Sequence, residues 1–138
     1  MIRKATAEDL PRILELGAEF LAIGPYAWVP LDTAAFSKFA LALIEVGVIF
    51  LSDDGMIGGC LSPFYFNPSV VMAAELFWFA RAGGQDLREA LEAWAQERGC
   101  VAQTCSGLAD EREPAIRRLY ARAGYDVTEI AFVKRFQP

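Results

Sequence analysis

Histidine is absent from this chain of 138 residues, and its absence excludes several kinds of site. Zinc sites built on imidazole ligands need histidine. Ser/His and Cys/His catalytic pairs need it as well, because the imidazole activates the nucleophile. We therefore expect no metal site and no hydrolase chemistry of that type.

Cysteine is scarce, with only Cys60, Cys100 and Cys105 in the chain. An odd number of cysteines in apolar stretches is typical of buried free thiols in a reducing compartment rather than of a disulfide framework. Because no histidine can activate a thiolate, we interpret all three as core residues. This pattern predicts a cytoplasmic protein.

Basic residues are outnumbered, and long apolar runs are missing. The chain has 13 Lys and Arg against 18 Asp and Glu, a net charge of −5. A nucleic-acid or anionic-membrane surface needs a basic face, and no apolar run approaches the length of a membrane span. The first residues also resemble a strand more than a signal peptide. We expect neither nucleic acid nor membrane as a partner.

Hydrophobic residues make up 54% of the chain, enough to bury a core, and the length predicts one domain over residues 1–138. In the first half, Thr6 to Asp9 resembles a capping box that begins a helix ending near Gly24. Asp32 and Thr33 offer caps for a second helix that runs to about Val46.

The second half changes to a strand pattern. Val48–Leu51 and Met56–Leu61 flank an Asp-Asp-Gly turn and predict a hairpin. The later predictions are a connection bracketed by Pro63 and Pro68, a strand over Val70–Phe79, a helix opened by Gly83 and Gly84, a strand over Cys100–Cys105, a helix between Pro114 and Gly124, and a terminal strand over Val127–Phe136. This order predicts an α/β fold with a mixed, mostly antiparallel sheet flanked by helices and a parallel β-α-β crossover in the second half.

Three segments carry a resemblance to a known family. They are Ile-Arg-Lys-Ala-Thr-Ala-Glu-Asp-Leu-Pro-Arg-Ile at residues 2–13, Asp-Asp-Gly-Met-Ile-Gly-Gly at 53–59 and Arg-Leu-Tyr-Ala-Arg-Ala-Gly-Tyr at 118–125. In this order they resemble the GNAT (GCN5-related N-acetyltransferase) superfamily, whose members transfer an acyl group from a coenzyme A thioester to an amine. The resemblance implies acetyl-CoA as co-substrate and a small-molecule or protein amine as acceptor.

A narrower group, found in phage genomes, is similar at Glu75–Trp78 and at Glu92–Ala95. This likeness implies a viral or prophage origin, and then the host cytoplasm as location. Nineteen positions separate Glu75 from Trp94, fewer than in that group, which implies a shortened pyrophosphate loop.

The family binds pyrophosphate through a loop of pattern Gln/Arg-x-x-Gly-x-Gly/Ala at a helix start, where backbone N–H groups meet the anion. The candidate here is Arg81–Asp86, which ends in a carboxylate that would repel phosphate. Alternatively, the glycines form only a tight turn. The resemblance implies a coenzyme site made of Phe79, Ala80, Arg81, Gly83, Gly84 and Gln85.

Two residues are candidate catalysts. Tyr120 matches the family tyrosine that protonates the leaving thiolate. The sequence alone favours an aromatic on the inner face of an amphipathic helix, and the family resemblance reverses that order. Glu75 interrupts an apolar strand, and in a cleft its raised pKa would suit it to take a proton from an ammonium. It could also face outward, since alternation alone does not give its side of the sheet.

Aromatic residues border the acceptor pocket by the same resemblance. Tyr26, Trp28, Tyr65 and Phe66 are candidate substrate contacts, or they are packing residues. The leading hypothesis is an acetyl-CoA-dependent N-acetyltransferase. The alternative is a GNAT-derived structural or binding module that has lost the coenzyme, forming an oligomer or packing into a phage particle.

Overall fold

The computed structural model describes residues 1–136 and divides the chain into two compact units. The first spans Met1–Ser106, and the second begins at Gly107. The prediction of a single domain stays a prediction. No helix among residues 1–136 is both long and apolar enough to cross a membrane.

The first unit is built on a five-stranded sheet in the order β1-β2-β3-β4-β5. The strands are β1 (Arg3–Lys4), β2 (Val48–Leu51), β3 (Gly55–Phe64), β4 (Asn67–Ala80) and β5 (Gln103–Thr104). The first four pair antiparallel, whereas β5 pairs parallel to β4 after the helix that connects them. The predicted mixed α/β fold with a β-α-β crossover is therefore confirmed.

Local caps begin the first two helices as predicted. A short 3₁₀ turn, Ala7–Asp9, leads into α1 (Leu10–Ile23), and the Thr6 N–H donates to Asp9 Oδ2 over 2.8 Å. The second helix, α2 (Thr33–Val46), begins where Asp32 Oδ1 accepts from the Ala35 N–H over 2.9 Å. Each carboxylate satisfies an N–H that the helix leaves unpaired, so the start of each helix is fixed locally.

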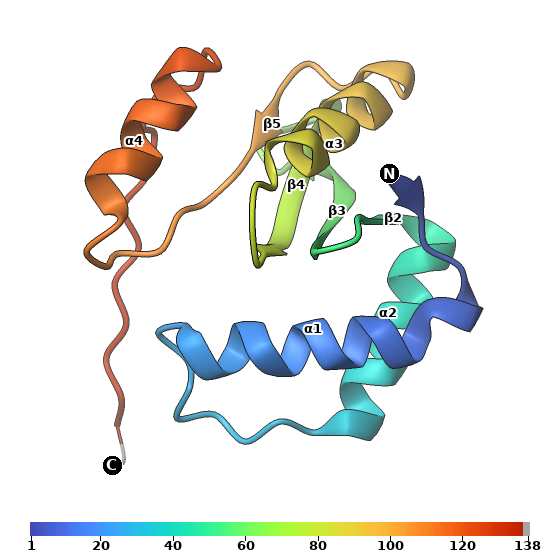
Figure 1. Ribbon diagram of the computed structural model, residues 1–138. Coiled ribbons are helices and arrows are strands. Elements are labelled where there is room, and N and C mark those ends of the chain that lie inside the picture. The colour runs from blue at the N-terminus through green and yellow to red at the C-terminus, as the bar shows by residue number, and fades with distance from the viewer. Residues whose placement is uncertain (137–138) are drawn as a thin grey trace. The chain divides into compact units, whose positions relative to one another are not determined.

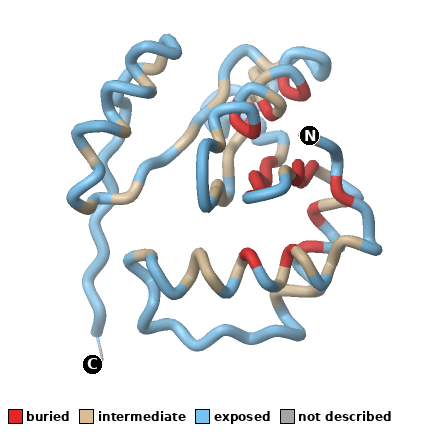
Figure 2. The backbone as a smooth tube through the Cα atoms, viewed as in Figure 1, coloured by how far each residue is buried: buried red, intermediate tan, exposed pale blue. Residues whose placement is uncertain are grey.

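The helices cover the two faces of the sheet in separate layers (Figure 1). On one face, Ile13 and Leu16 of α1 and Leu43 of α2 pack with Ile49 and Met56. On the other face, α3 (Gln85–Glu97) packs through a buried group that is shown in red in Figure 2: Leu87, Leu91, Trp94 and Ala95. The sheet is thus enclosed on both sides over its central strands.

A β-bulge interrupts the pairing of β3 with β4. Gly58 pairs with Phe77, but Gly59 pairs with Glu75, so Leu76 is an extra residue on β4. Two glycines oppose this point because there is no room for a side chain: a Cβ on Gly59 would lie 2.7 Å from Leu91 Cδ1. The bulge shifts the alternation of β4, so that Ala73 and Trp78 pack on the same layer while Phe77 packs on the opposite one.

Three predicted boundaries were wrong. The connection between Pro63 and Pro68 shrinks to Tyr65 and Phe66, because both prolines lie in the paired strands β3 and β4. This end of the hairpin extends past the other strands, so a proline without a backbone N–H is tolerated there. The strand over Cys100–Cys105 shortens to β5 because only two residues pair with β4. No strand forms over Val127–Phe136, because these residues make no backbone ladder with another strand and β-propensity alone does not produce one.

The second unit contains one helix, α4 (Glu113–Arg122), in its described part. Pro114 lies in its first turn, and Gly124 follows its end with φ at +87°. Both signals were predicted from the sequence. The ring of Tyr120 packs edge-on against Tyr125, with centroids 5.1 Å apart.

Truncation of the α3 layer tests this core. Leu91 is fully buried and packs over Gly59, whose missing side chain leaves space for it. We expect Leu91→Ala to lower the free energy of unfolding by about 2–5 kcal/mol. The matched control Leu41→Ala, on the exposed side of α2 at 39% exposure, should change it by less than about 1 kcal/mol. Urea unfolding of both variants is the measurement, and equal losses would contradict the assignment of α3 to the core.

Candidate functional site

Glu75 lies on β4 directly before the extra residue of the bulge. Its side chain is half-buried, and burial raises the pKa of its carboxyl to about 7, although a hydrogen bond from the Ser106 N–H at 3.3 Å acts in the opposite direction. Alternation from Ala73 places the side chain on the face that α3 covers. Near neutral pH this carboxyl therefore exchanges a proton readily.

The edge of β4 beyond Ala74 has no partner strand in the part of the chain that the structure describes. β5 pairs only with Ala73 and Ala74, and the chain then leaves the sheet. The Arg81 N–H bonds back to Asp54 O, and Phe79 pairs with Met56, so the intervening Ala80 directs its own N–H and C=O away from β3. The open edge therefore presents the backbone of Ala80, whereas the backbone of Phe79 is turned to β3.

The loop between β4 and α3 is four residues long and turns on two glycines. Gly83 and Gly84 have φ angles of +67° and +107°, in the left-handed region that favours glycine. The indole Nε1 of Trp78 donates to Gly84 O over 3.1 Å and so fixes the loop to β4. The backbone N–H groups of Gln85 and Asp86 have no hydrogen-bond acceptor among residues 1–136. The helix start thus keeps unpaired donors for an anion.

Side chains at the helix start are less favourable to an anion than the backbone is. Asp86 lies exposed in the first turn of α3. A carboxylate there stabilises the helix by interaction with its dipole, but it also repels a phosphate bound at the same N–H groups. Gln85 donates to Glu89 Oε1 over 3.1 Å instead of pointing freely from the loop.

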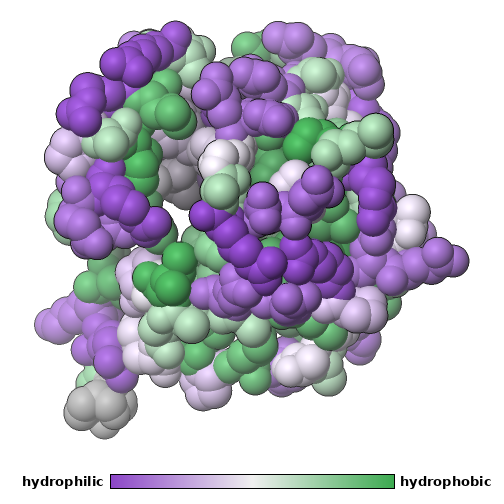
Figure 3. Space-filling view, in the orientation of Figure 1, coloured by the Kyte–Doolittle hydropathy of each residue, from purple (hydrophilic) through white to green (hydrophobic). Residues whose placement is uncertain are grey.

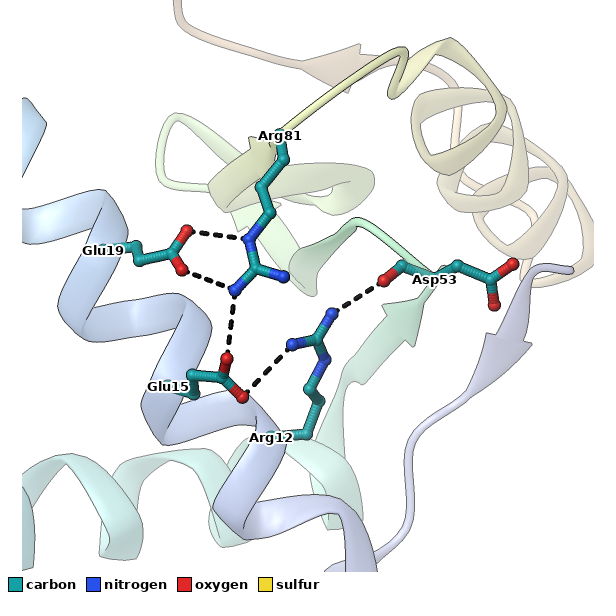
Figure 4. Close-up of polar contacts among 5 residues, drawn as sticks. All are labelled: Arg12, Glu15, Glu19, Asp53 and Arg81. Atoms are coloured by element: carbon teal, nitrogen blue, oxygen red, sulfur yellow. Dashed lines mark hydrogen bonds and ion pairs between the residues drawn. The ribbon is translucent and has the colours of Figure 1, made fainter.

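Arg81 extends from the end of β4 to α1, where two carboxylates bind it (Figure 4). Its Nε and Nη2 donate to Glu19 over 2.9 and 2.5 Å, and Nη2 also donates to Glu15 over 3.0 Å. These bonds lower the pKa of both carboxyls and raise that of the guanidinium. Figure 3 shows hydrophilic side chains gathered over this region beside α1. We call Arg81, Glu15 and Glu19 the α1 clamp.

No direct signal in the sequence marks the acidic side of the α1 clamp. Glu15 and Glu19 are four residues apart on a helix, a spacing that usually marks a solvated face. Arg12 joins the same network, with Nη1 donating to Glu15 over 3.1 Å and Nη2 to Asp53 O over 2.7 Å. Only the packing of α1 beside the β2–β3 turn and the β4–α3 loop reveals that these residues meet.

The candidate acceptor residues lie on exposed loops. Tyr26 and Trp28, between α1 and α2, are 49% and 45% exposed. Tyr65 is 79% exposed at the tip of the β3–β4 hairpin, where its ring lies 5.1 Å from that of Phe64 and 4.5 Å from that of Phe66. The contacts at the tip are aromatic packing, and a substrate role for these residues stays a prediction.

The remaining candidates belong to other parts of the chain. Tyr120 belongs to the second unit, whereas Glu75 and Phe79–Gln85 belong to the first. No disulfide joins the three cysteines in the described residues, and each is half-buried. Cys60 and Cys100 pack against the two core layers, and burial raises the pKa of the Cys60 thiol. A raised pKa makes that thiol a poor nucleophile.

The pKa of Glu75 predicts how stability depends on pH. Between about pH 4.5 and pH 7 the folded carboxyl keeps a proton that the unfolded one loses, so the free energy of unfolding falls as pH rises through this window. Glu75→Gln removes this pH dependence, because glutamine does not titrate. We expect the free energy of unfolding of the variant, relative to the wild type, to rise by about 2–3 kcal/mol between pH 5 and pH 8 in urea unfolding. A difference that does not change with pH would show that Glu75 titrates normally.

Comparison with known proteins gives structural matches only. No family model and no curated protein matches the chain. A GCN5-related N-acetyltransferase from Ralstonia eutropha JMP134 superposes with a TM-score of 0.70 at 19% identity, covering 97% of each chain. Glucosamine-6-phosphate N-acetyltransferase from Arabidopsis thaliana gives 0.72 at 14% identity, covering 99% of this chain and 98% of that one.

A third structure, AAC(6')-Iy in complex with the bisubstrate analogue CoA-S-monomethyl-acetylneamine, gives a TM-score of 0.69 at 15% identity, covering 100% of this chain and 98% of that one. Identities this low show the fold alone. The chain has the mixed α/β fold of the GNAT acetyltransferases.

Proposed function

We propose that this protein transfers an acetyl group from acetyl-CoA to the amine of an acceptor. The observation that carries the proposal is the bulged β4. The strand carries a half-buried carboxyl of pKa about 7 and, among residues 1–136, an edge without a partner strand. It leads into a glycine loop and a helix start whose first N–H groups have no acceptor in the same residues. This combination suits a thioester ligand with a pyrophosphate and an amine that must lose a proton.

Acetyl-CoA supplies an activated acetyl thioester when it binds. The N–H groups of Gln85 and Asp86 would hold its pyrophosphate, and the open glycine loop gives the phosphate room, since nothing lies within 4 Å of a Cβ built on Gly83. The backbone N–H and C=O of Ala80 at the open edge would form hydrogen bonds with the amide-bearing pantetheine arm of the coenzyme. The backbone thus fits the coenzyme better than the side chains do.

Glu75 acts in this proposal as the general base. An amine attacks only in its neutral form, and a carboxylate whose conjugate acid has a pKa of about 7 can accept the ammonium proton directly or through one water. Tyr120 is the proposed general acid for the thiolate, on the strength of the family resemblance at residues 118–125 alone. The acceptor is a small-molecule or protein amine, and Tyr26, Trp28 and Tyr65 are its proposed contacts.

A second function is favoured by the side chains of the loop. Asp86 occupies the first helical turn and the Arg81 guanidinium is engaged by α1, so the positive charge of the loop is neutralised. A binding or structural module with a degenerate coenzyme loop, such as a component of a phage particle, would need no pyrophosphate site. That module would assemble with itself or a partner in the absence of coenzyme.

Titration calorimetry with acetyl-CoA, combined with release of free thiol, tests the proposed function. Binding together with amine-dependent thiol release supports the transferase. Absence of binding at millimolar acetyl-CoA overturns it, and a complex whose size is the same with and without acetyl-CoA then favours the module.

Neutralising Asp86 should strengthen coenzyme binding. Asp86→Asn removes a negative charge beside the proposed phosphate site, so we expect the Kd of acetyl-CoA to fall by about three- to tenfold. The same change removes a favourable interaction with the helix dipole and should lower stability by roughly 0.3–1 kcal/mol. Calorimetry and urea unfolding give the two readouts. Glu97→Gln, at the other end of α3, is the control, and an unchanged Kd for Asp86→Asn would place the phosphates elsewhere.

Removing the proposed base should impair the reaction without harming the fold. We expect Glu75→Gln to lower kcat/KM by about 10²–10⁴-fold. The wild-type profile of kcat/KM should rise through about pH 7 as the carboxyl ionises, and the variant should lack this rise. Glu45→Gln on the exposed face of α2 is the control. If kcat/KM of the variant still rises through about pH 7, Glu75 is not the base.

A further inference from the structure

The α1 clamp joins two parts of the first unit that are distant in sequence. Glu15 and Glu19 lie one helical turn apart on α1, and both reach the guanidinium of Arg81 at the end of β4. Arg12 ties Glu15 to the carbonyl of Asp53 in the β2–β3 turn. All of these side chains lie on the side of α1 that faces the sheet ends (Figure 4).

Most N–H groups of the Arg81 guanidinium form hydrogen bonds with Glu15 and Glu19. A guanidinium has five N–H groups in a fixed planar fork. The Nε–H and both N–H groups of Nη2 are directed to carboxylate oxygens, which leaves only Nη1 without a partner in the described residues. The bidentate geometry with Glu19 is the strongest form of such a pair.

The charges of the α1 clamp also oppose a direct role with phosphate. Two carboxylates surround one guanidinium, so the three side chains together carry a net negative charge. The Nη1 donor points away from the Glu19 carboxylate, but Glu15 and Glu19 would still repel an anion that approached it and offset part of its attraction to the arginine.

The backbone of Arg81 shows what the contact can do instead. Its N–H donates to Asp54 O over 2.9 Å, so the residue is fixed at both its main chain and its side-chain end. Gly83 and Gly84 follow within three positions, and they have the greatest backbone freedom of any residue type. When Arg81 is fixed, the β4–α3 loop can adopt fewer conformations, so the N–H groups of Gln85 and Asp86 keep a more constant direction.

We propose that Arg81 is a positioning residue, which Glu15 and Glu19 hold so that the β4–α3 loop presents its backbone N–H groups to the pyrophosphate of acetyl-CoA. The inference rests on the proposed function, and it assigns to α1 a part in coenzyme binding. It differs from the expectation that the Arg81 side chain is itself the phosphate ligand.

The two roles predict opposite effects of neutralising the carboxylates. If Arg81 is a phosphate ligand, Glu15→Gln and Glu19→Gln release it and strengthen coenzyme binding. If it is a positioning residue, the same changes loosen the loop and weaken binding. The sign of the effect therefore decides between them, without any variant of Arg81 itself.

We expect Glu19→Gln to raise the KM and Kd of acetyl-CoA roughly five- to tenfold, and the Glu15→Gln/Glu19→Gln double variant to raise them further, with kcat within about twofold of the wild type. Glu113→Gln breaks a comparable exposed ion pair with Arg117 on α4 and serves as the matched control. A Kd that is unchanged or lower in the double variant overturns the proposal.

Trypsin provides a readout that needs no coenzyme. Cleavage after Arg81 requires the side chain to leave the α1 clamp and the loop to open locally. We expect the double variant to be cut between Arg81 and Ala82 at least about fivefold faster than the wild type, with the rate after the exposed Arg98 unchanged as an internal control. Equal rates at Arg81 overturn the proposal. If the wild type fails to bind acetyl-CoA, the proposed function fails, and the cleavage rate alone decides whether the α1 clamp holds the loop.

Discussion

The one-residue offset between β3 and β4 determines where the candidate site lies. Gly58 and Gly59 leave β3 without side chains at this point, so Phe77 and Leu91 pack into the space from opposite faces. The extra residue on β4 then changes which backbone groups face outward. Before the bulge β4 is paired with β5; after it, the same strand has an open edge that leads into the glycine loop. One packing constraint therefore positions the half-buried Glu75 and the helix start along a single strand.

The sequence predicted the parts of this fold that depend on neighbouring residues. The caps at Thr6 and Asp32 and the turn before Gly55 are local signals, and each begins an element where expected. The bulge is a property of two paired strands, so the spacing of residues in β4 alone could not show it. Val127–Phe136 has the composition of a strand, but no backbone ladder joins it to another strand, and a strand forms only through such pairing.

In the candidate site, too, the sequence predicted the local features but not the contacts between distant residues. Gly83 and Gly84 mark the turn before α3 because only glycine adopts such positive φ angles without strain. The expectation that burial raises the pKa of Glu75 was conditional on its facing inward, and the register supplies that condition. The partners of Arg81 could not be predicted, since an acidic pair on α1 has the same sequence pattern whether it faces solvent or an arginine 62 positions away.

The charges around the loop explain how a chain with a net charge of −5 could still hold an anionic coenzyme. Backbone N–H groups at a helix start bind an anion without depending on any side chain, and their dipoles are fixed by the fold. Such a site tolerates an arginine that is neutralised by Glu15 and Glu19, provided that the loop itself is held in place. Asp86, in the first turn of α3, then becomes a charge that opposes binding directly. Affinity in this arrangement depends on loop geometry more than on local positive charge, and a rigid contact to α1 is a physical means of providing it.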